Sequence, residues 1–559
     1  MSEESGKEVR EIIVDIMKNE GVEYAFGHTG AQIRFLWDSI DRDEQVNVVF
    51  NKQEGNAVYM AMGHYQQSGK VGVVLGTTGP GVQNMVAGIA SAHLDSIPMV
   101  IIGSMVPSYS AGKNALQDSS GRGRAVDQLQ IFQACTKSAM LAMTPGEIPT
   151  IFREAFRVAK SGRPGPVYVD VPGDYWQHKV DYQSLAAETY KCISPLAADL
   201  VQTEHIMSRL YAAQKPVIVI GEGAFEGGNI RQQIRDFIDQ TGIPFAVSPL
   251  AKDYVDEIDL LCLGALRVTG GNRYLYQCLK AADFVLSLGN RFEQWEWDWM
   301  SDKKTVLPNA VIAHIDPDED EIGRVFSAEY SMRTSASGFF TAAQSFLTLN
   351  SRHPKHDEFA RECDAALSFV RKVYEDNGGL HPKNLIKVAQ DVLPDDACIL
   401  CDTGNIGSLV ITQLKTSLTQ RFFHAQRNSP MGYSLPASMG AALEHQGPVV
   451  SFIGDGSFNM TSNELALLLN IQSKIIIIIA NDGSSGAIRD GNLRDFNSTT
   501  VSEHENPAYA EMAKSYNMKG FTVNNEHEFS EALLQSLEGT QSVIIDAVFG
   551  DMSGMWEEQ

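Results

Sequence analysis

The sequence predicts an α/β protein of three parallel-sheet domains, and three observations lead to this fold class. Short apolar runs rich in β-branched residues alternate with longer amphipathic stretches along the 559 residues, which is the pattern of repeated βαβ units. The runs are apolar at successive positions, as expected for strands that helices cover on both faces. Two polar stretches interrupt the pattern, and the length itself corresponds to about three to four domains.

The individual elements follow from these runs. Strands are expected at residues 71–75, 99–102, 167–171, 217–220, 284–288, 311–315, 398–401, 449–453, 475–479 and 543–548. Helices are expected between them, including residues 55–67, 148–160, 230–240 and 462–470.

The two polar stretches are expected to be linkers. They cover residues 181–195 and 350–383, the second containing a further helix. We therefore expect domains at residues 1–180, 195–349 and 380–559.

Composition excludes several classes of function. The formal net charge of −24 makes the chain a poor ligand for nucleic acid or for an anionic membrane surface. The longest apolar run, Ile475–Ala480, is far shorter than the ~20 residues of a membrane span. The first ten residues are polar and charged, and the seven scattered cysteines do not indicate a disulfide framework, so we expect a cytoplasmic protein. Cys398 and Cys401 form a C-x-x-C inside an expected strand, which favours a structural role over a metal or redox one.

Polar residues follow two successive strands in a way that indicates metal and phosphate binding. Asp455 comes directly after the strand at 449–453, in the stretch GDGSFN, and Asn481 comes 26 residues later, in NDG, after the next strand. Ligands of open α/β sheets bind at this edge, where loop and helix N–H groups favour phosphate. An Asp carboxylate, an Asn amide oxygen and the carbonyl of Gly483 are hard oxygen donors that suit Mg²⁺. The alternative is that these are two ordinary strand-to-helix turns. Either turn alone would favour this alternative, but the two turns at this spacing do not.

The GDG and NDG stretches at this spacing resemble the fingerprint of the thiamin-diphosphate-dependent enzymes. The resemblance implies that Asp455, Asn481 and the Gly483 carbonyl hold Mg²⁺, which in turn holds the diphosphate of thiamin diphosphate. It also implies diphosphate contacts from two glycine-containing turns, whose candidate residues are Gly404, Asn405, Gly454, Gly456 and Ser457.

Other segments carry the resemblance through the rest of the chain. NKQEGNAVYMAMGHY, residues 51–65, resembles the segment with the catalytic glutamate, which would be Glu54. GTTGPGVQN, residues 76–84, resembles the glycine-rich turn near the pyrimidine ring and gives Asn84 as a cofactor-binding candidate. SPMGYSLPASMGAA, residues 429–442, resembles the segment whose large apolar residue, here Met431, supports the bent cofactor and so takes part in catalysis.

Within this family the chain is most similar to the large subunit of acetolactate synthase and its relatives. The resemblance implies three doubly wound domains, which are pyrimidine-binding, central and diphosphate-binding, and a homodimer or homotetramer. It implies a carboligase that decarboxylates a pyruvate-like 2-oxo acid and joins the remaining fragment to a second carbonyl compound. A non-ligating decarboxylase, or a lyase acting on C–C bonds or acyl-CoA substrates, is the alternative. FAD is left open as a further cofactor, because Arg291 is present but the acidic-Arg continuation of FAD-bearing relatives is not.

The substrate pocket departs from the biosynthetic enzymes. Gly491 stands where they place a tryptophan, with Arg489 and Arg494 beside it. Five side chains are candidates for substrate contact, namely Gln32, His28, His93, Gln117 and Arg124, the last two competing for one position in a long loop.

The sequence disfavours two other classes of function. A nicotinamide-dependent oxidoreductase would use GEGAFEGG, residues 221–228, but Glu226 replaces the third glycine of that motif. A catalytically inactive binding subunit would have lost Glu54 or Asp455, and both are present.

Overall fold

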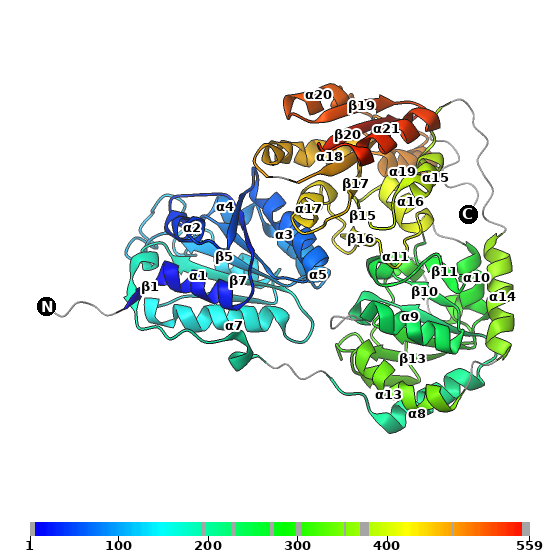
Figure 1. Cartoon of the computed structure of the whole chain (residues 1–559). Helices are drawn as coiled ribbons and strands as arrows, with labels where there is room; N and C mark the ends of the chain where they lie inside the picture. The colour runs from blue at the N-terminus through cyan, green and yellow to red at the C-terminus, as the bar shows by residue number, and fades with distance from the viewer. Residues whose placement is uncertain are drawn as a thin grey trace.

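Each third of the chain folds around its own six-stranded parallel sheet (Figure 1). The computed structural model describes residues 6–191, 196–224, 230–268, 273–297, 303–350, 354–368, 379–471 and 473–550. Each of the three ranges expected for domains contains one of these sheets. The predicted fold class is therefore confirmed.

The N-terminal domain has the strand order β3-β2-β4-β5-β7-β6, with every neighbouring pair parallel. Its strands are β2 (Tyr24–Gly27), β3 (Asn47–Phe50), β4 (Gly72–Gly76), β5 (Met99–Met105), β6 (Ser138–Leu141) and β7 (Pro166–Pro172), and a small antiparallel pair joins β1 (Lys7–Glu8) to β8 (Lys179–Val180). Its helices are α1 (Val9–Asn19), α2 (Arg34–Asp41), α3 (Glu54–Ser68), α4 (Pro80–Gln83), α5 (Val86–Leu94), α6 (Gln128–Gln133) and α7 (Ile148–Lys160), with short 3₁₀ turns at Pro145–Glu147, Tyr175–Gln177 and Ala187–Tyr190.

The central domain has the order β11-β10-β9-β12-β13-β14, again all parallel. Its strands are β9 (Pro216–Ile220), β10 (Phe245–Val247), β11 (Cys262–Ala265), β12 (Phe284–Leu288), β13 (Val311–Asp316) and β14 (Tyr330–Arg333). Its helices are α8 (Leu200–Ala212), α9 (Ile230–Thr241), α10 (Arg273–Ala281), α11 (Gln294–Trp297), α12 (Lys303–Val306), α13 (Ala336–Leu349) and α14 (Pro354–Ser368), with 3₁₀ turns at Glu222–Ala224 and Pro249–Tyr254.

The C-terminal domain has the order β16-β15-β17-β18-β20-β19, which repeats the order of the N-terminal sheet strand for strand. Its strands are β15 (Cys398–Cys401), β16 (Arg421–His424), β17 (Val449–Gly454), β18 (Ile475–Asn481), β19 (Lys519–Val523) and β20 (Val543–Val548). Its helices are α15 (Pro382–Val392), α16 (Asn405–Gln413), α17 (Ser434–Ala441), α18 (Asp455–Thr461), α19 (Gly486–Phe496), α20 (Tyr509–Ser515) and α21 (Glu526–Glu538), with the 3₁₀ helix η6 at Ser462–Leu469.

Helices α3 and α17 join the N-terminal and C-terminal domains (Figure 1). A Cβ atom at Gly63 would lie 2.0 Å from the carbonyl oxygen of Ala437, and one at Gly440 would lie 2.0 Å from that of Met60. Glycine is therefore required on both helices for their backbones to approach so closely. Both helices are almost wholly buried, and one apolar cluster continues through them from one domain into the other.

The differences from the expected elements are in short strands, including the interior strand β10, and in helix types. All ten expected apolar runs are strands, but the sequence analysis did not identify short strands such as β3, β6, β14 and β16, which lie at sheet edges and are partly exposed. The helix expected at 462–470 is a 3₁₀ helix, and α14, in the second expected linker, packs on the central domain. In the described part of the chain no helix combines the length and the apolar character needed to cross a membrane.

The C-x-x-C motif is structural in this fold. Cys398 and Cys401 are three positions apart on β15, so their side chains point to opposite faces of the sheet and enter different apolar clusters. Burial raises the pKa of both thiols well above its usual range. Neither thiol is placed for metal binding or disulfide exchange with the other.

Candidate functional site

Asp455 and Asn481 converge at the carboxyl edge of the C-terminal sheet. Strands β17 and β18 are neighbours in register, with Gly454 opposite Ala480, so the next residue of each strand ends at the same height. Asp455 is 2% exposed, and its Oδ2 accepts a hydrogen bond of 2.9 Å from the backbone N–H of Gly483. The three predicted metal ligands therefore lie together, although residue numbers separate them widely.

Further hydrogen bonds set the orientation of the predicted ligand side chains. Asp546 on β20 accepts a hydrogen bond of 2.8 Å from Asn481 Nδ2, which leaves Oδ1 of that amide facing Asn506 Nδ2, the same nitrogen that contacts Asp455 Oδ2. Asp455 Oδ1 accepts one of 2.7 Å from the N–H of Gly456. A carboxylate, an amide oxygen and a backbone carbonyl presented in this way fit a hard divalent cation such as Mg²⁺.

The two turns predicted to bind phosphate end neighbouring strands of the same sheet. Gly404 caps the N-terminus of α16 at φ +116°, a conformation that favours glycine, and no atom of the described residues lies within 4 Å of a Cβ placed there. Asn405 follows in the first turn of α16 and donates to Asp490 Oδ2 at 3.0 Å. The turn at 454–457 leads into α18, and Ser457 is buried at its start. Because β15 and β17 are neighbours, both turns face one edge, and the donor set fits a diphosphate.

Met431 lies beside the GDG turn. Its side chain is 40% exposed, and its terminal methyl carbon would be 3.5 Å from a Cβ at Gly456. Asp402, at the end of β15, is fully buried and accepts hydrogen bonds from the N–H groups of Gly432 at 3.0 Å and Ser434 at 2.8 Å. Sequence reasoning missed Asp402, although its position directly after a buried strand was a usable signal.

Glu54 begins α3 at the edge of the N-terminal sheet. Its Oε2 accepts a hydrogen bond of 3.0 Å from Asn84 Nδ2, and its Oε1 would lie 3.7 Å from a Cβ at Gly81. The predicted catalytic glutamate and the glycine-rich turn therefore meet in space. Their proximity is fixed by the fold, because β2 and β4 are neighbours and α3 connects β3 to β4.

Glu464 of η6 holds the start of α3 against the C-terminal domain. This buried carboxylate accepts from Asn51 Nδ2 at 2.9 Å, from the N–H of Lys52 at 3.0 Å and from Asn56 Nδ2 at 2.9 Å. Three donors on the segment that carries Glu54 thus end on one side chain of the other domain. The pairing spans more than 400 residues of sequence, and no local pattern signals it.

Models of known protein families match all three domains. A thiamine pyrophosphate enzyme N-terminal TPP-binding domain matches residues 7–130, the central domain of these enzymes matches 203–343, and their C-terminal TPP-binding domain matches 402–547. This chain belongs to the thiamine pyrophosphate enzymes. The thiamin-dependent enzyme class expected from the sequence is confirmed.

Curated relatives of this thiamine pyrophosphate enzyme cover nearly its whole length. The acetolactate synthase large subunit of Lactococcus lactis subsp. lactis (strain IL1403) is 29% identical over 531 residues, covering 94% of this chain and 89% of that protein. The acetolactate synthase isozyme 3 large subunit of Escherichia coli (strain K12) is 26% identical over 545 residues, covering 94% and 92%. A probable acetolactate synthase large subunit of Methanococcus aeolicus is 25% identical over 566 residues, covering 98% and 92%.

The candidate substrate residues of this enzyme are spread over the N-terminal domain. Gln117 is exposed, but its carbonyl accepts from Thr78 Oγ1 at 3.1 Å, so it lies against the glycine-rich turn, while Arg124 is exposed. His28 is exposed at the end of β2, with Nδ1 2.8 Å from the Asn51 carbonyl.

The other two candidates have structural surroundings. The Gln32 carbonyl accepts from Trp176 Nε1 at 2.9 Å, and its side chain packs on Gly173, where a Cβ would be 2.3 Å from Oε1. His93 lies at the end of α5 near Gly165, and burial lowers the pKa of its imidazole. His28 and Gln117 are the two of the five with contacts to the segments next to Glu54, namely Asn51 and the glycine-rich turn.

Gln128 was not identified from the sequence, and it organises the glycine-rich turn. Its Oε1 accepts from the N–H of Gly79 at 3.0 Å, and its Nε2 donates to Tyr168 at 2.6 Å and to Asp170 at 3.1 Å. Burial raises the pKa of Asp170 to about 7. The turn near Glu54 is thus anchored to a buried polar group of β7.

The environment of Gly491 is open in the described part of the chain. No atom of those residues lies within 4 Å of a Cβ placed there. Arg489 is held by Asp482 at 3.2 Å and donates to Ser484 Oγ at 2.9 Å, and Arg494 is exposed and pairs with Asp495. No side chain of the described residues fills the space in which an indole would stand.

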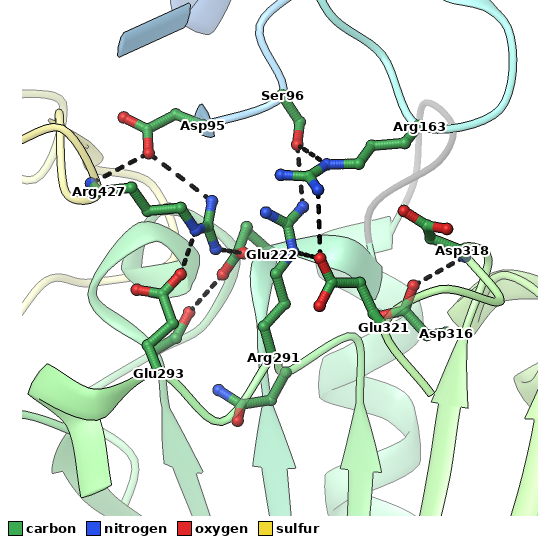
Figure 2. Close-up of polar contacts among 12 residues, drawn as sticks. Asp95, Ser96, Arg163, Glu222, Arg291, Glu293, Asp316, Asp318, Glu321 and Arg427 are labelled. Atoms are coloured by element: carbon green, nitrogen blue, oxygen red, sulfur yellow. Dashed lines mark hydrogen bonds and ion pairs between the residues drawn. The ribbon is translucent and has the colours of Figure 1, made fainter. Parts of the chain in front are cut away.

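Charged residues of all three domains meet at the carboxyl edge of the central sheet (Figure 2). Arg427 of the C-terminal domain pairs with Glu222 and Glu293 of the central domain, and its Nη1 lies 3.6 Å from Asp95 Oδ1 of the N-terminal domain. Burial alone would raise the pKa of Glu222, but Arg427 and Arg291 outweigh it and lower this pKa to about 2.

A second set of contacts completes the junction. Arg291, after β12, and Arg163 of the N-terminal domain both donate to Ser96 Oγ at 2.9 Å. Arg163 Nη1 also donates to Glu321 Oε1 at 3.2 Å (Figure 2). The three domains are therefore held in one arrangement by buried and partly buried ion pairs.

This junction bears on dinucleotide binding. The central strand order places β9 beside β12 at the point where connections reverse, which is where dinucleotides bind in such sheets. Glu222, Asp316 and Glu321 occupy the strand ends there, and burial raises the pKa of Asp316 to about 7. Arg163, Arg291 and Arg427 pair with carboxylates at that edge, so its charge argues neither for nor against a pyrophosphate, and FAD is left open. Part of the 221–228 motif lies outside the described residues.

Proposed function

We propose that this chain is a Mg²⁺- and thiamin-diphosphate-dependent carboligase of the acetolactate synthase type. It would decarboxylate a pyruvate-like 2-oxo acid and join the remaining fragment to a second carbonyl compound. The observation that carries the proposal is the convergence of Asp455, Asn481 and Gly483 beside the two phosphate-binding turns. The acetolactate synthase relatives support the carboligase activity.

Each part of the site has a role that its geometry supports. Asp455, Asn481 and Gly483 would hold Mg²⁺, and Gly404, Asn405 and the 454–457 turn would hold the diphosphate. Thiamin diphosphate, when bound, supplies a carbon nucleophile that stabilises the charge released by decarboxylation.

Two further side chains would set the reactivity of the cofactor. Glu54 would hold or transfer a proton at the aminopyrimidine ring, with Asn84 orienting its carboxylate. Met431, half-exposed beside Gly456, would support the cofactor from below.

We also propose that the enzyme is a homodimer or homotetramer. Ile488, Leu493 and Phe496 lie within one side of α19 and are 57%, 45% and 74% exposed. Met460, near the same edge, is 62% exposed. A second copy of the chain would cover this apolar surface, and light scattering of the purified protein would measure the assembly.

Product analysis tests the proposed reaction. The purified protein is incubated with Mg²⁺, thiamin diphosphate and ¹³C-labelled pyruvate, with and without an acceptor aldehyde, and products are identified by NMR. A 2-hydroxy ketone or acetohydroxy acid is expected. Acetaldehyde alone in both reactions would indicate the non-ligating decarboxylase. If pyruvate is not consumed while another 2-oxo acid or an acyl-CoA is cleaved, the lyase alternative holds.

A further inference from the structure

One side chain outside the predicted metal site contacts two of its ligands at once. Asn506, in the loop between α19 and α20, donates from Nδ2 to Asp455 Oδ2 at 2.6 Å and to Asn481 Oδ1 at 2.9 Å. A single nitrogen thus lies between the two oxygens that a cation would need. Sequence reasoning did not identify this residue.

The third predicted ligand is contacted by the same segment. The backbone N–H of His504 donates to the Gly483 carbonyl at 2.9 Å, and His504 Nε2 lies 3.5 Å from Asp455 Oδ2. Residues 504–506, called the latch below, therefore engage all three predicted ligands through adjacent positions of one loop.

The orientation of the Asn506 amide follows from its neighbours. Tyr509 donates its hydroxyl hydrogen to Asn459 Oδ1 at 3.0 Å, so Asn459 presents Nδ2 to its other partner. That partner is Asn506 Oδ1, at 3.2 Å. The donor end of Asn506 faces Asp455 because that carboxylate offers only acceptors and Asp546 leaves Asn481 Oδ1 as the other acceptor.

The loop that carries the latch is strained. Val501 has φ +61° while its side chain is 92% exposed. A β-branched residue rarely adopts this conformation, and no packing of the side chain compensates here.

We propose that the latch occupies the metal site in the absence of metal and is displaced when a divalent cation binds, an inference that rests on the proposed Mg²⁺ site. Mg²⁺ binds oxygen at about 2.1 Å and needs the same lone pairs on Asp455 and Asn481 that Asn506 Nδ2 uses. The amide and the cation therefore compete. The latch keeps the ligands paired and buried before metal arrives, and it sets both the affinity for metal and the rate of metal entry.

Removing the competing amide should make metal binding tighter and faster. A hydrogen bond to a charged group is worth enough that its loss from the metal-free state corresponds to about ten-fold in affinity. Asn506→Ala is therefore expected to bind the cation about ten-fold more tightly than the wild type. Asn506→Leu keeps the approximate size but has neither a donor nor a ligand atom, so it should bind about as tightly as the alanine variant.

Mn²⁺ is the probe, because loss of the EPR signal of the free ion measures binding without any enzyme activity. The wild type, Asn506→Ala and Asn506→Leu are titrated, and stopped-flow mixing gives the association rate. Asn492→Ala is the matched control, because Asn492 donates to Thr500 of the same loop but is not bonded to the three ligands. If the alanine variant does not fold, by circular dichroism, the leucine variant carries the test.

The outcomes distinguish the latch proposal from the proposed Mg²⁺ site on which it rests. Tighter and faster Mn²⁺ binding in the Asn506 variants, with the control unchanged, supports the latch. Unchanged or weaker binding overturns it and, if weaker, makes Asn506 a residue that positions the ligands. If Asp455→Ala binds Mn²⁺ as the wild type does, the metal site itself is wrong and the latch is refuted with it.

Discussion

Replacing Glu464 by glutamine should loosen the start of α3 without changing the shape of the side chain. The two carboxylate oxygens of Glu464 accept from three donors, on Asn51, Lys52 and Asn56. Glutamine has one oxygen and one NH₂ group, so in either orientation at least one of these donors faces another donor. The segment that positions Glu54 would lose part of its attachment to the C-terminal domain.

The expected magnitude follows from the chemistry of these bonds. A hydrogen bond to a charged group contributes about 1.5–3 kcal/mol net, and a buried donor left unpaired costs about 1–3 kcal/mol. We therefore expect local opening at the Lys52 amide to become easier by about 2–3 kcal/mol. That change corresponds to hydrogen exchange about 30- to 150-fold faster.

Hydrogen–deuterium exchange of peptides covering residues 50–60 measures this opening directly. Glu511→Gln is the matched control, because Glu511 is exposed on α20 and pairs with Lys514 of the same helix. Exchange in the Glu464 variant within three-fold of the wild type would refute the reasoning. Exchange that rises equally in distant peptides of the central domain would instead indicate global destabilisation.

Four further predictions follow from the site and its surroundings. Asp455→Ala should abolish retention of thiamin diphosphate while circular dichroism stays unchanged; equal cofactor affinity, or an affinity insensitive to EDTA, would contradict the metal site. Glu54→Gln should keep most cofactor binding but slow C2–H exchange and turnover by about 10²–10⁴, and exchange at the wild-type rate would exclude Glu54 as the activator. Burial raises the pKa of Asp170 from 3.8 to about 7, so the folded protein keeps a proton that the unfolded chain releases. As pH rises across that range, the folded protein should lose up to about 4 kcal/mol of stability through this carboxyl. Asp170→Asn should therefore flatten the fall in melting temperature between pH 4 and pH 7, and an identical profile would contradict this prediction. The open space at Gly491 should leave little preference for 2-oxobutyrate over pyruvate as acceptor, since selection by one methylene is worth only ~1–3 kcal/mol. A strong preference for 2-oxobutyrate in direct competition would show that the apolar wall is present. Gly491→Trp should increase the preference for 2-oxobutyrate.

The buried strands could be predicted because nearly all of their residues are apolar. Ile475–Ile479 and Val449–Ile453 bury both faces, so their burial is written into the sequence itself. Edge strands such as β14 could not be found in this way, because one side of each is open to solvent and their residues are mixed.

The residues of the candidate site also differ in whether a local sequence pattern predicts them. Asp455, Asn481 and Glu54 could be predicted because each directly follows a strand or begins a helix, where a local pattern carries the information. Residues that act across the fold could not, since their partners are chosen by packing. Glu464 reaches Asn51 only because α3 and α17 bring two domains into contact.

The sequence by itself determined three parallel sheets, the ends of their strands and the residue types placed there, because burial and turn chemistry act over a few neighbouring positions. Only the tertiary structure decided what faces those ends. Asn506 is 51 residues from Asp455, in a loop whose polar sequence has no period, yet its amide lies against two predicted ligands. Its place follows from the packing of α20 on β19 and β20 and from the hydrogen bond between Tyr509 and Asn459, which are properties of the folded chain.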